Sequence, residues 1–192
     1  MSEAKGHIGF AMCGSFCTLE RSLKVMQELA GQGWRITPLM SDMVYQCDTR
    51  FGTANSFRER VTEICGDDII HTIVDAEPLG PKLHLDALVI LPCTGNTLAK
   101  MAQGITDSTV TMAAKAQLRS NRPVVVGLAS NDALSANLRN IGMMLSRKQV
   151  FFVPLFQDDP LSKPHSLICR FELTPKTLDY ALNAKQLQPL LQ

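Results

Sequence analysis

A turn of small polar residues follows a long apolar run in the middle of the chain. The turn is Pro-Cys-Thr-Gly-Asn-Thr at 92–97; it comes directly after the apolar run 87–91 and leads into a helical pattern. In an open α/β sheet, ligands bind where the carboxyl ends of strands meet the N-termini of helices. Hydroxyl, amide and glycine residues at such a place can hold the polar groups of a ligand. We therefore predict a ligand site that includes Thr94, Asn96 and Thr97.

Comparable polar residues follow three other apolar runs. Gly14 and Ser15 come after the run 7–12, Ser41 comes after 34–40, and Asn131 and Asp132 come after 123–128. Such groups at successive strand ends suit a flat heteroaromatic ligand with a phosphate tail, because each ring edge and phosphate oxygen needs a fixed partner. Helix capping alone would also place these residue types at the turns. The shared position at several strand ends favours one common site.

The turn at 14–18 lacks the well-known phosphate-binding sequences. Its residues, Gly-Ser-Phe-Cys-Thr, could hold a phosphate through backbone N–H groups ahead of a helix. They match neither G-x-G-x-x-G nor G-x-x-x-x-G-K-[ST], which argues against an ordinary dinucleotide fold and against an ATPase. A phosphate cradle and a plain helix cap both stay open for this turn.

Strand-like and helix-like runs alternate along the chain. We expect strands at 7–12, 34–40, 69–74, 87–91, 123–128 and 150–154, and helices at 19–30, 53–65, from 98, at 134–145 and from 174. This alternation predicts a single α/β domain whose doubly wound, mostly parallel, six-stranded sheet is flanked by helices. Pro38 argues against a fully hydrogen-bonded central place for the second strand. Thr18 is expected at the N-cap of the first helix.

Composition fits one compact domain and argues against several classes of partner. The 192 residues are 45% hydrophobic and 19% charged, which is enough to build a core. Lys and Arg number 19 against 18 Asp and Glu and form no basic block, so nucleic acid is not expected as a partner. The opening residues lack the apolar region of a signal peptide, and no apolar run approaches the roughly 20 residues that span a bilayer. We expect a cytoplasmic chain with no membrane partner.

The six cysteines include no CxxC pair, which predicts reduced thiols and no disulfide framework. Cys93 stands at a strand end ahead of a helix, where a thiol pKa can fall, but no histidine neighbours it in the sequence. A small residue that fills the core is the simpler interpretation. His165 and Cys169 lack a second pair of ligands, so no metal site is predicted. No side chain is assigned a catalytic role.

Longer motifs carry a resemblance to known families. The Gly-Ser pair at 14–15, the segment 92–107 and the Asn-Asp pair at 131–132 resemble the flavoprotein superfamily of cysteine decarboxylases and flavin prenyltransferases. Four further segments resemble the family of dipicolinate synthase B subunits of spore-forming bacteria: EPLGPK at 77–82, QDDP at 157–160, KPHS at 163–166 and KQLQP at 185–189. This second resemblance covers nearly the whole chain.

The resemblance implies a Rossmann-like, flavodoxin-type fold and a part in dipicolinate formation. The family acts in the mother-cell cytoplasm during sporulation, oxidising a dihydro- or hydroxytetrahydrodipicolinate intermediate of the lysine pathway. FMN, or an analogous phosphate ligand, would be surrounded by Gly14, Ser15, Ser41, Thr94, Asn96 and Thr97, with Asn131 and Asp132 nearer the substrate. The implied partner is the A subunit of dipicolinate synthase, whose Rossmann domain would carry NAD or NADP. Members of the superfamily form homo-oligomers.

Two departures from the superfamily limit what can be carried over. The decarboxylases have a catalytic histidine where this chain has 77–81, which contains none, and His84 does not align with it. Their Pro-x-Met-Asn segment is replaced by 128–132, which is closer to the prenyltransferases but lacks their arginine–glutamate pair. A freestanding FMN-dependent decarboxylase or prenyltransferase, and a noncatalytic assembly subunit, remain alternatives.

A small dicarboxylate substrate would need cationic or N–H donors, because dipicolinate precursors are dianions at neutral pH. Among the cations of the chain, Arg139 and Lys163 are candidates for this role. A solvated helix face or loop explains both residues equally well.

Overall fold

Seven strands form one sheet in the computed structural model, which describes residues 5–80 and 83–192. The strands are β1 (Gly6–Met12), β2 (Trp34–Met40), β3 (Ala87–Cys93), β4 (Val124–Ser130), β5 (Val150–Phe152), β6 (Leu155–Phe156) and β7 (Leu167–Cys169). Their order is β2-β1-β3-β4-β7-β6, and β5 also pairs with β4. Strands β1 to β5 run parallel, whereas β7 is antiparallel to both β4 and β6. The mostly parallel sheet is confirmed, with one strand more than the six expected.

The central strands are buried on both faces, as their unbroken apolar sequences require. All residues of β3 are buried, and so are the last five of β1. Ile8 of β1 pairs with Ile36 on one side and Ala87 on the other. Strand β2, which contains Pro38, lies at the edge of the sheet, as expected for a strand with a missing N–H donor.

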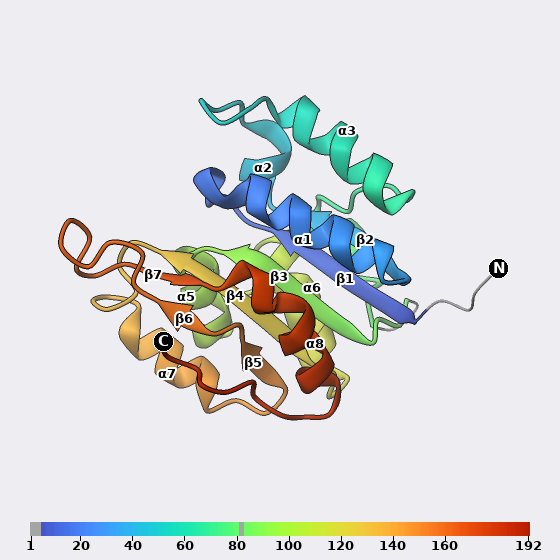
Figure 1. Ribbon diagram of the computed structural model, residues 1–192. Coiled ribbons are helices and arrows are strands. Elements are labelled where there is room, and N and C mark those ends of the chain that lie inside the picture. The colour runs from blue at the N-terminus through green and yellow to red at the C-terminus, as the bar shows by residue number, and fades with distance from the viewer. Residues whose placement is uncertain (1–4, 81–82) are drawn as a thin grey trace.

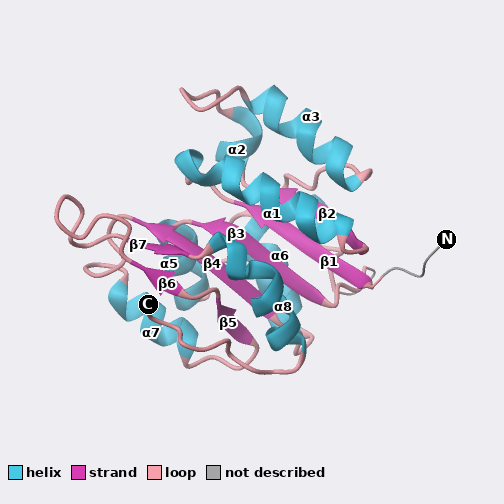
Figure 2. Cartoon of the chain, in the orientation of Figure 1, coloured by secondary structure: helices cyan, strands magenta, loops and turns pink. Residues whose placement is uncertain are grey.

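Helices cover both faces of the sheet (Figures 1 and 2). On one face lie α1 (Leu19–Gly31) and α8 (Thr174–Leu182), and on the other lie α5 (Gly95–Gln103), α6 (Thr109–Arg119) and α7 (Leu138–Leu145). Helix α3 (Ala54–Cys65) packs against α1 and β2, with α2 (Asp42–Gln46) beside it, and the short α4 (Ile73–Ala76) packs against α6. The doubly wound arrangement is therefore confirmed. Within the described ranges, no helix is long and apolar enough to cross a membrane.

The strand expected at 69–74 is wrong. Only Ile70 pairs there, in a single bridge with Leu39, and the chain then enters α4. The Thr72 hydroxyl accepts a hydrogen bond from the amide of Asp75 and so starts this helix. A local side-chain cap therefore outweighs the apolar run.

Besides α4, four of the helices and strands named above were not expected from the sequence: α2, α6, β6 and β7. Strands of two and three residues are too short to show a period of two, and both depend on pairing with distant segments. Helix α6 starts with a capping box, in which Ser108 and Thr111 exchange side-chain and backbone hydrogen bonds. In the 77–82 motif, Pro81 and Lys82 lie outside the described residues.

The helices that follow β1 and β3 start differently. Thr18 occupies the N-cap of α1 as expected, but its hydroxyl donates to the Ser15 carbonyl and caps no amide of the helix. The Thr94 hydroxyl does cap α5, because it accepts a hydrogen bond from the amide of Thr97. In the turn after β3 a side chain thus caps the helix, whereas in the turn after β1 the Thr18 side chain bonds back to the backbone of the turn.

Candidate functional site

A cavity of about 490 Å³ lies at the carboxyl ends of β1, β3 and β4, a volume typical of small-molecule sites. Its wall is made by the turns after these strands and by the loop between β6 and β7. The predicted site residues that line it are Gly14, Ser15, Thr94, Asn96, Asn131, Asp132 and Lys163. Segments far apart in the sequence therefore meet at one edge of the sheet.

The turn after β1 forms one wall of the cavity. The amide of Cys13 donates to the Pro92 carbonyl at 3.1 Å, and the amide of Ser15 donates to the Cys13 carbonyl at 2.8 Å. A Cβ placed on Gly14 would lie 3.5 Å from Met43 Cβ, which is ordinary contact, and its φ is not in the left-handed region. Because the fold leaves room for a Cβ at Gly14, this position can test how closely a ligand approaches the turn.

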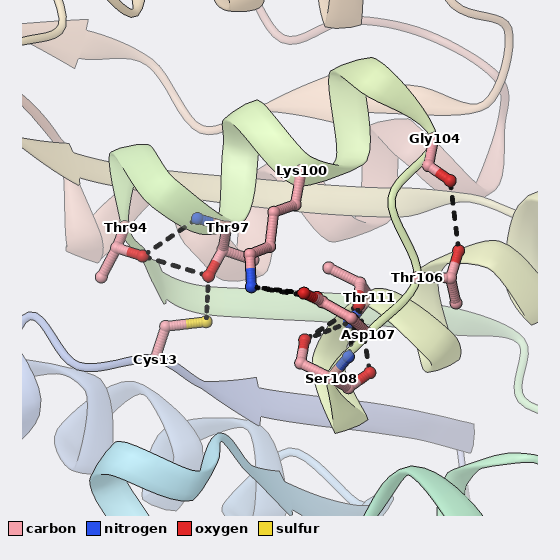
Figure 3. A network of polar contacts seen from close by, with 9 residues as sticks. All are labelled: Cys13, Thr94, Thr97, Lys100, Gly104, Thr106, Asp107, Ser108 and Thr111. Atoms are coloured by element: carbon pink, nitrogen blue, oxygen red, sulfur yellow. Dashed lines mark hydrogen bonds and ion pairs between the residues drawn. The ribbon is translucent and has the colours of Figure 1, made fainter.

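The start of α5 forms a second wall and is tied to β1 (Figure 3). The hydroxyls of Thr94 and Thr97 lie 3.0 Å apart, and Thr97 donates to the Cys13 sulfur at 3.4 Å. Thr97 therefore points to the neighbouring strand and does not line the cavity, unlike Thr94 and Asn96. The amides of Gly95 and Asn96 are in the first turn of the helix, where N–H groups have no intrahelical acceptor and can donate to an anion.

Ser41 lies at the end of β2, beside the turn that contains Gly14. Its amide donates to the Met12 carbonyl at 3.0 Å, and it is the N-cap residue of α2. The side-chain oxygen of Ser41 is buried and finds no hydrogen-bond partner in the described part of the chain. Buried hydroxyls are normally hydrogen-bonded, so this group is available to a polar ligand atom. Ser41 is not part of the cavity wall.

The end of β4 holds a network around a carboxylate. The Ser130 hydroxyl donates to Asp132 Oδ1 at 2.5 Å, and the Asn137 amide donates to both carboxylate oxygens of Asp132 at 2.9 Å. The Ser130 hydroxyl, followed by the Asn137 amide, holds the pKa of Asp132 below its ordinary value. Asn131 beside it is exposed and lines the cavity. Asn137 was not predicted, because no spacing in the sequence relates it to Asp132.

The loop between β6 and β7 brings one cation to the cavity. Lys163 Nζ lies 3.0 Å from Asp158 Oδ2, and Ser166 donates its hydroxyl to the Ser130 carbonyl at 3.3 Å. The hydrogen bond between Lys163 and Asp158 is the main cause that raises the pKa of Lys163 and lowers the pKa of Asp158. Asp158 and Ser166 belong to the QDDP and KPHS motifs, but nothing in the sequence indicated that both line the cavity.

Other predicted or available cations lie away from this wall. Arg139 is exposed on α7 and does not line the cavity. Lys100 on α5 pairs with Asp107 at 2.9 Å (Figure 3). The described residues of the wall therefore include one lysine, Lys163, which pairs with Asp158, and a second carboxylate, Asp132, with no further lysine or arginine.

The thiols near the strand ends are poor nucleophiles. Cys13, Cys93 and Cys169 are fully buried, and all six cysteines are free. Burial raises the pKa of the Cys13 thiol to about 11 and raises those of Cys93 and Cys169 further above their ordinary values. The interpretation of Cys93 as a core residue fits this environment. The described residues contain no group of three or more His, Cys, Asp or Glu side chains that could hold a metal ion.

The arrangement is suited to binding an anionic ligand in a polar cavity. Backbone N–H groups at the start of α5, small hydroxyls and one lysine offer donors, while the Asp132 carboxylate offers an acceptor. No histidine is present in the described wall. Acid–base chemistry that depends on an imidazole is therefore not supported by this chain's own residues.

Comparisons with known proteins extend these observations. A family model described as "Flavoprotein" matches residues 1–174. The B subunit of dipicolinate synthase from Bacillus subtilis (strain 168) is 45% identical over 192 residues, which is 100% of this chain and 96% of the relative.

Solved structures give the same family and a wider fold relationship. The crystal structure of the dipicolinate synthase B subunit from Bacillus halodurans C has a TM-score of 0.91 and 42% identity, and covers 100% of this chain and 98% of that one. The FMN-dependent cysteine decarboxylase SpaF has a TM-score of 0.68 at 21% identity, covering 94% of this chain and 98% of its own. At that identity the likeness to SpaF concerns the fold alone.

Proposed function

Because this chain belongs to the flavoprotein family and, within it, to the family of dipicolinate synthase B subunits, we propose that it binds FMN and a pyridine-type dicarboxylate precursor. It would act with the nicotinamide-binding A subunit in forming dipicolinate. The observation that carries the proposal is the 45% identity over the full chain. The cavity at the strand ends supports the proposal, because it could hold such ligands. The place of action would be the mother-cell cytoplasm of a sporulating bacterium.

The residues at the strand ends fit FMN. The buried Ser41 hydroxyl has no partner among the described residues, and Gly14 leaves the first turn free of a side chain. The turn at Gly14, Ser15 and the amides at the start of α5 would hold the phosphate, and the Ser41 hydroxyl, which lies outside the cavity wall, would join them by a change of rotamer. Bound FMN would supply an electron-accepting ring system to the site.

The remaining predicted residues would orient the ring and separate it from the core. Thr94 and Asn96 line the cavity and offer hydroxyl and amide groups to ring edges. Thr97 acts indirectly, because its hydroxyl joins Thr94 to Cys13 and so fixes the position of the α5 turn against β1.

The substrate side of the cavity would be formed by Asn131, Asp132 and Lys163. A dicarboxylate carries two negative charges, whereas the only lysine of the described wall already shares its charge with Asp158. A second cation for the ligand would come from another chain, either the partner that carries the nicotinamide or a second copy of this one. The charge balance of the wall thus favours a protein that works in an assembly over a freestanding enzyme.

Decarboxylation of a cysteine, the reaction for which SpaF is named, is less well supported for this chain. The segment 77–81 contains no histidine, and the described cavity wall contains none either. The alternatives of a freestanding decarboxylase or prenyltransferase rest on likeness in fold alone.

The proposal is tested by reconstitution of the two proteins. This chain is purified with and without the A subunit of dipicolinate synthase, and dipicolinate formation from the hydroxytetrahydrodipicolinate intermediate is measured with NAD or NADP. We expect the two proteins to copurify and product formation to need both. Product formation at the same rate without this chain would contradict its part in the reaction. Steady decarboxylation by this chain alone would favour the freestanding enzyme.

A further inference from the structure

Asn137 has one possible orientation in its network. The ionised Asp132 carboxylate only accepts hydrogen bonds, so Asn137 must turn its Nδ2 toward it, and Asn137 Oδ1 then accepts from the Asn140 amide nitrogen at 2.8 Å. Both asparagines are buried, with 6% of Asn137 and 4% of Asn140 exposed. A buried amide held at both ends gives the carboxylate a fixed donor.

The Asp132 carboxylate is therefore oriented before any ligand arrives. The carboxylate accepts hydrogen bonds from the Ser130 hydroxyl and the Asn137 amide, and it lines the cavity. A carboxylate has about four lone-pair sites, so these contacts leave room for a further donor. Its charge repels a ligand carboxylate and attracts a ligand N–H or O–H group.

No lysine or arginine of the described wall pairs with Asp132, so no cation competes with a ligand donor for this carboxylate. Lys163 lies with Asp158 on the β6–β7 loop, and no other lysine or arginine joins it in that part of the wall. The hydrogen bonds from Ser130 and Asn137 favour the ionised form of Asp132, which is the form that only accepts hydrogen bonds.

We propose that Asn137 is a positioning residue that fixes Asp132 as the acceptor for an O–H or N–H group of the ligand, so that the cavity selects cyclic dicarboxylates bearing such a donor. The proposal rests on the proposed function and deepens it. A hydroxytetrahydrodipicolinate substrate has a hydroxyl donor, whereas the ring nitrogen of dipicolinate only accepts. The site would bind the substrate more tightly than the aromatic product, which aids product release.

A matched pair of ligands tests this directly. Dipicolinate and its 4-hydroxy derivative carry the same two carboxylates, and only the 4-hydroxy derivative has an O–H donor, or an N–H donor in its pyridone form. Their dissociation constants are measured by calorimetry with the full chain loaded with FMN and in complex with the A subunit. We expect the 4-hydroxy derivative to bind about ten-fold tighter, since a hydrogen bond to a charged group contributes on this scale. Asp132→Asn and Asn137→Asp should each bring the ratio close to one.

Several controls keep the result interpretable. Asn183→Asp makes the same chemical change at an exposed residue at the C-terminus of α8 and should keep the ten-fold ratio. Ser130→Ala removes one hydrogen-bond donor to Asp132, and the same ratio is measured on this variant if Asn137→Asp does not fold. The ratio is measured on one protein sample, so a loss of folded protein affects both ligands equally, and a merely structural role of Asn137 would leave it unchanged.

The outcomes separate the two proposals. Equal binding of both ligands by the unmodified protein, or an unchanged ten-fold ratio in folded Asn137→Asp, would overturn the positioning role and leave the dicarboxylate site standing. Binding of neither ligand would overturn the dicarboxylate site and this inference together.

Discussion

Gly95, the first residue of α5, packs so closely against the Ser130 hydroxyl that a Cβ at position 95 would overlap its oxygen. The same Cβ would lie 2.6 Å from Asn137 Nδ2 and 2.9 Å from Asp132 Oδ1. Gly95 has no left-handed φ, so space and not backbone conformation requires the glycine. The turn after β3 and the network after β4 therefore depend on each other.

Replacing Gly95 by alanine tests this dependence. We expect Gly95→Ala to lower the free energy of unfolding by about 1–3 kcal/mol, because the added methyl group overpacks a buried polar network. Chemical denaturation measures the change. Gly142→Ala on α7 is the matched control: a Cβ there meets no atom within 4 Å, and alanine in a helix should be neutral or stabilising by up to about 1 kcal/mol. Equal stability of the two variants would contradict the close packing.

Asn96 lines the cavity from the exposed side of the α5 turn. We expect Asn96→Ala to weaken ligand binding by about 1–3 kcal/mol, because a ligand polar group would lose its partner on desolvation. Calorimetric titration measures the affinity, and Asn183→Ala, an exposed asparagine on another face, is the control. Unchanged affinity of Asn96→Ala would remove this residue from the site.

The pH dependence of Asp132 follows from its donors. The Ser130 hydroxyl and the Asn137 amide lower the pKa of Asp132 in the folded protein below the unfolded value of about 3.9. The ionised carboxylate thus contributes stability above that unfolded pKa, and this contribution is lost as pH falls through the folded pKa. Ser130→Ala should raise the pKa of Asp132, as measured by the chemical shift of its carboxyl carbon between acid and neutral pH. An unchanged titration would show that the Ser130 hydroxyl does not favour the ionised form.

Thiol labelling distinguishes the cavity rim from the core. Cys17 is exposed and lines the cavity, whereas Cys13, Cys93 and Cys169 are buried. An alkylating reagent should modify Cys17 in the native protein, and the three buried thiols only after unfolding, because burial raises their pKa values. Peptide mass spectrometry measures the order, and bound ligand should slow labelling of Cys17. Labelling of Cys93 as fast as Cys17 in the native protein would contradict this environment.

The sequence predicted those parts of the fold that local patterns determine. The apolar runs of β1, β3 and β4 and the polar turns after them were sufficient to place Gly14, Thr94 and Asp132 at one edge of the sheet. The strand at 69–74 failed because Thr72 caps a helix at that point.

The rest depended on contacts between distant residues. Strand β7 exists through its pairing with β4 and β6, and only this pairing brings Lys163 and Asp158 to the cavity. The direction of Thr97 toward Cys13, and the position of Asn137 against Asp132, follow from packing between elements that no spacing in the sequence records.

Titration of the purified protein with FMN, followed by visible absorption, tests the account most directly. We expect one FMN to bind per chain with a changed flavin spectrum. Gly14→Val, once its fold is checked by circular dichroism, should lose this binding, because its side chain would occupy the turn that the phosphate approaches. Absence of FMN binding by the unmodified protein, or unchanged binding by folded Gly14→Val, would contradict a flavin site at the ends of β1 and β3.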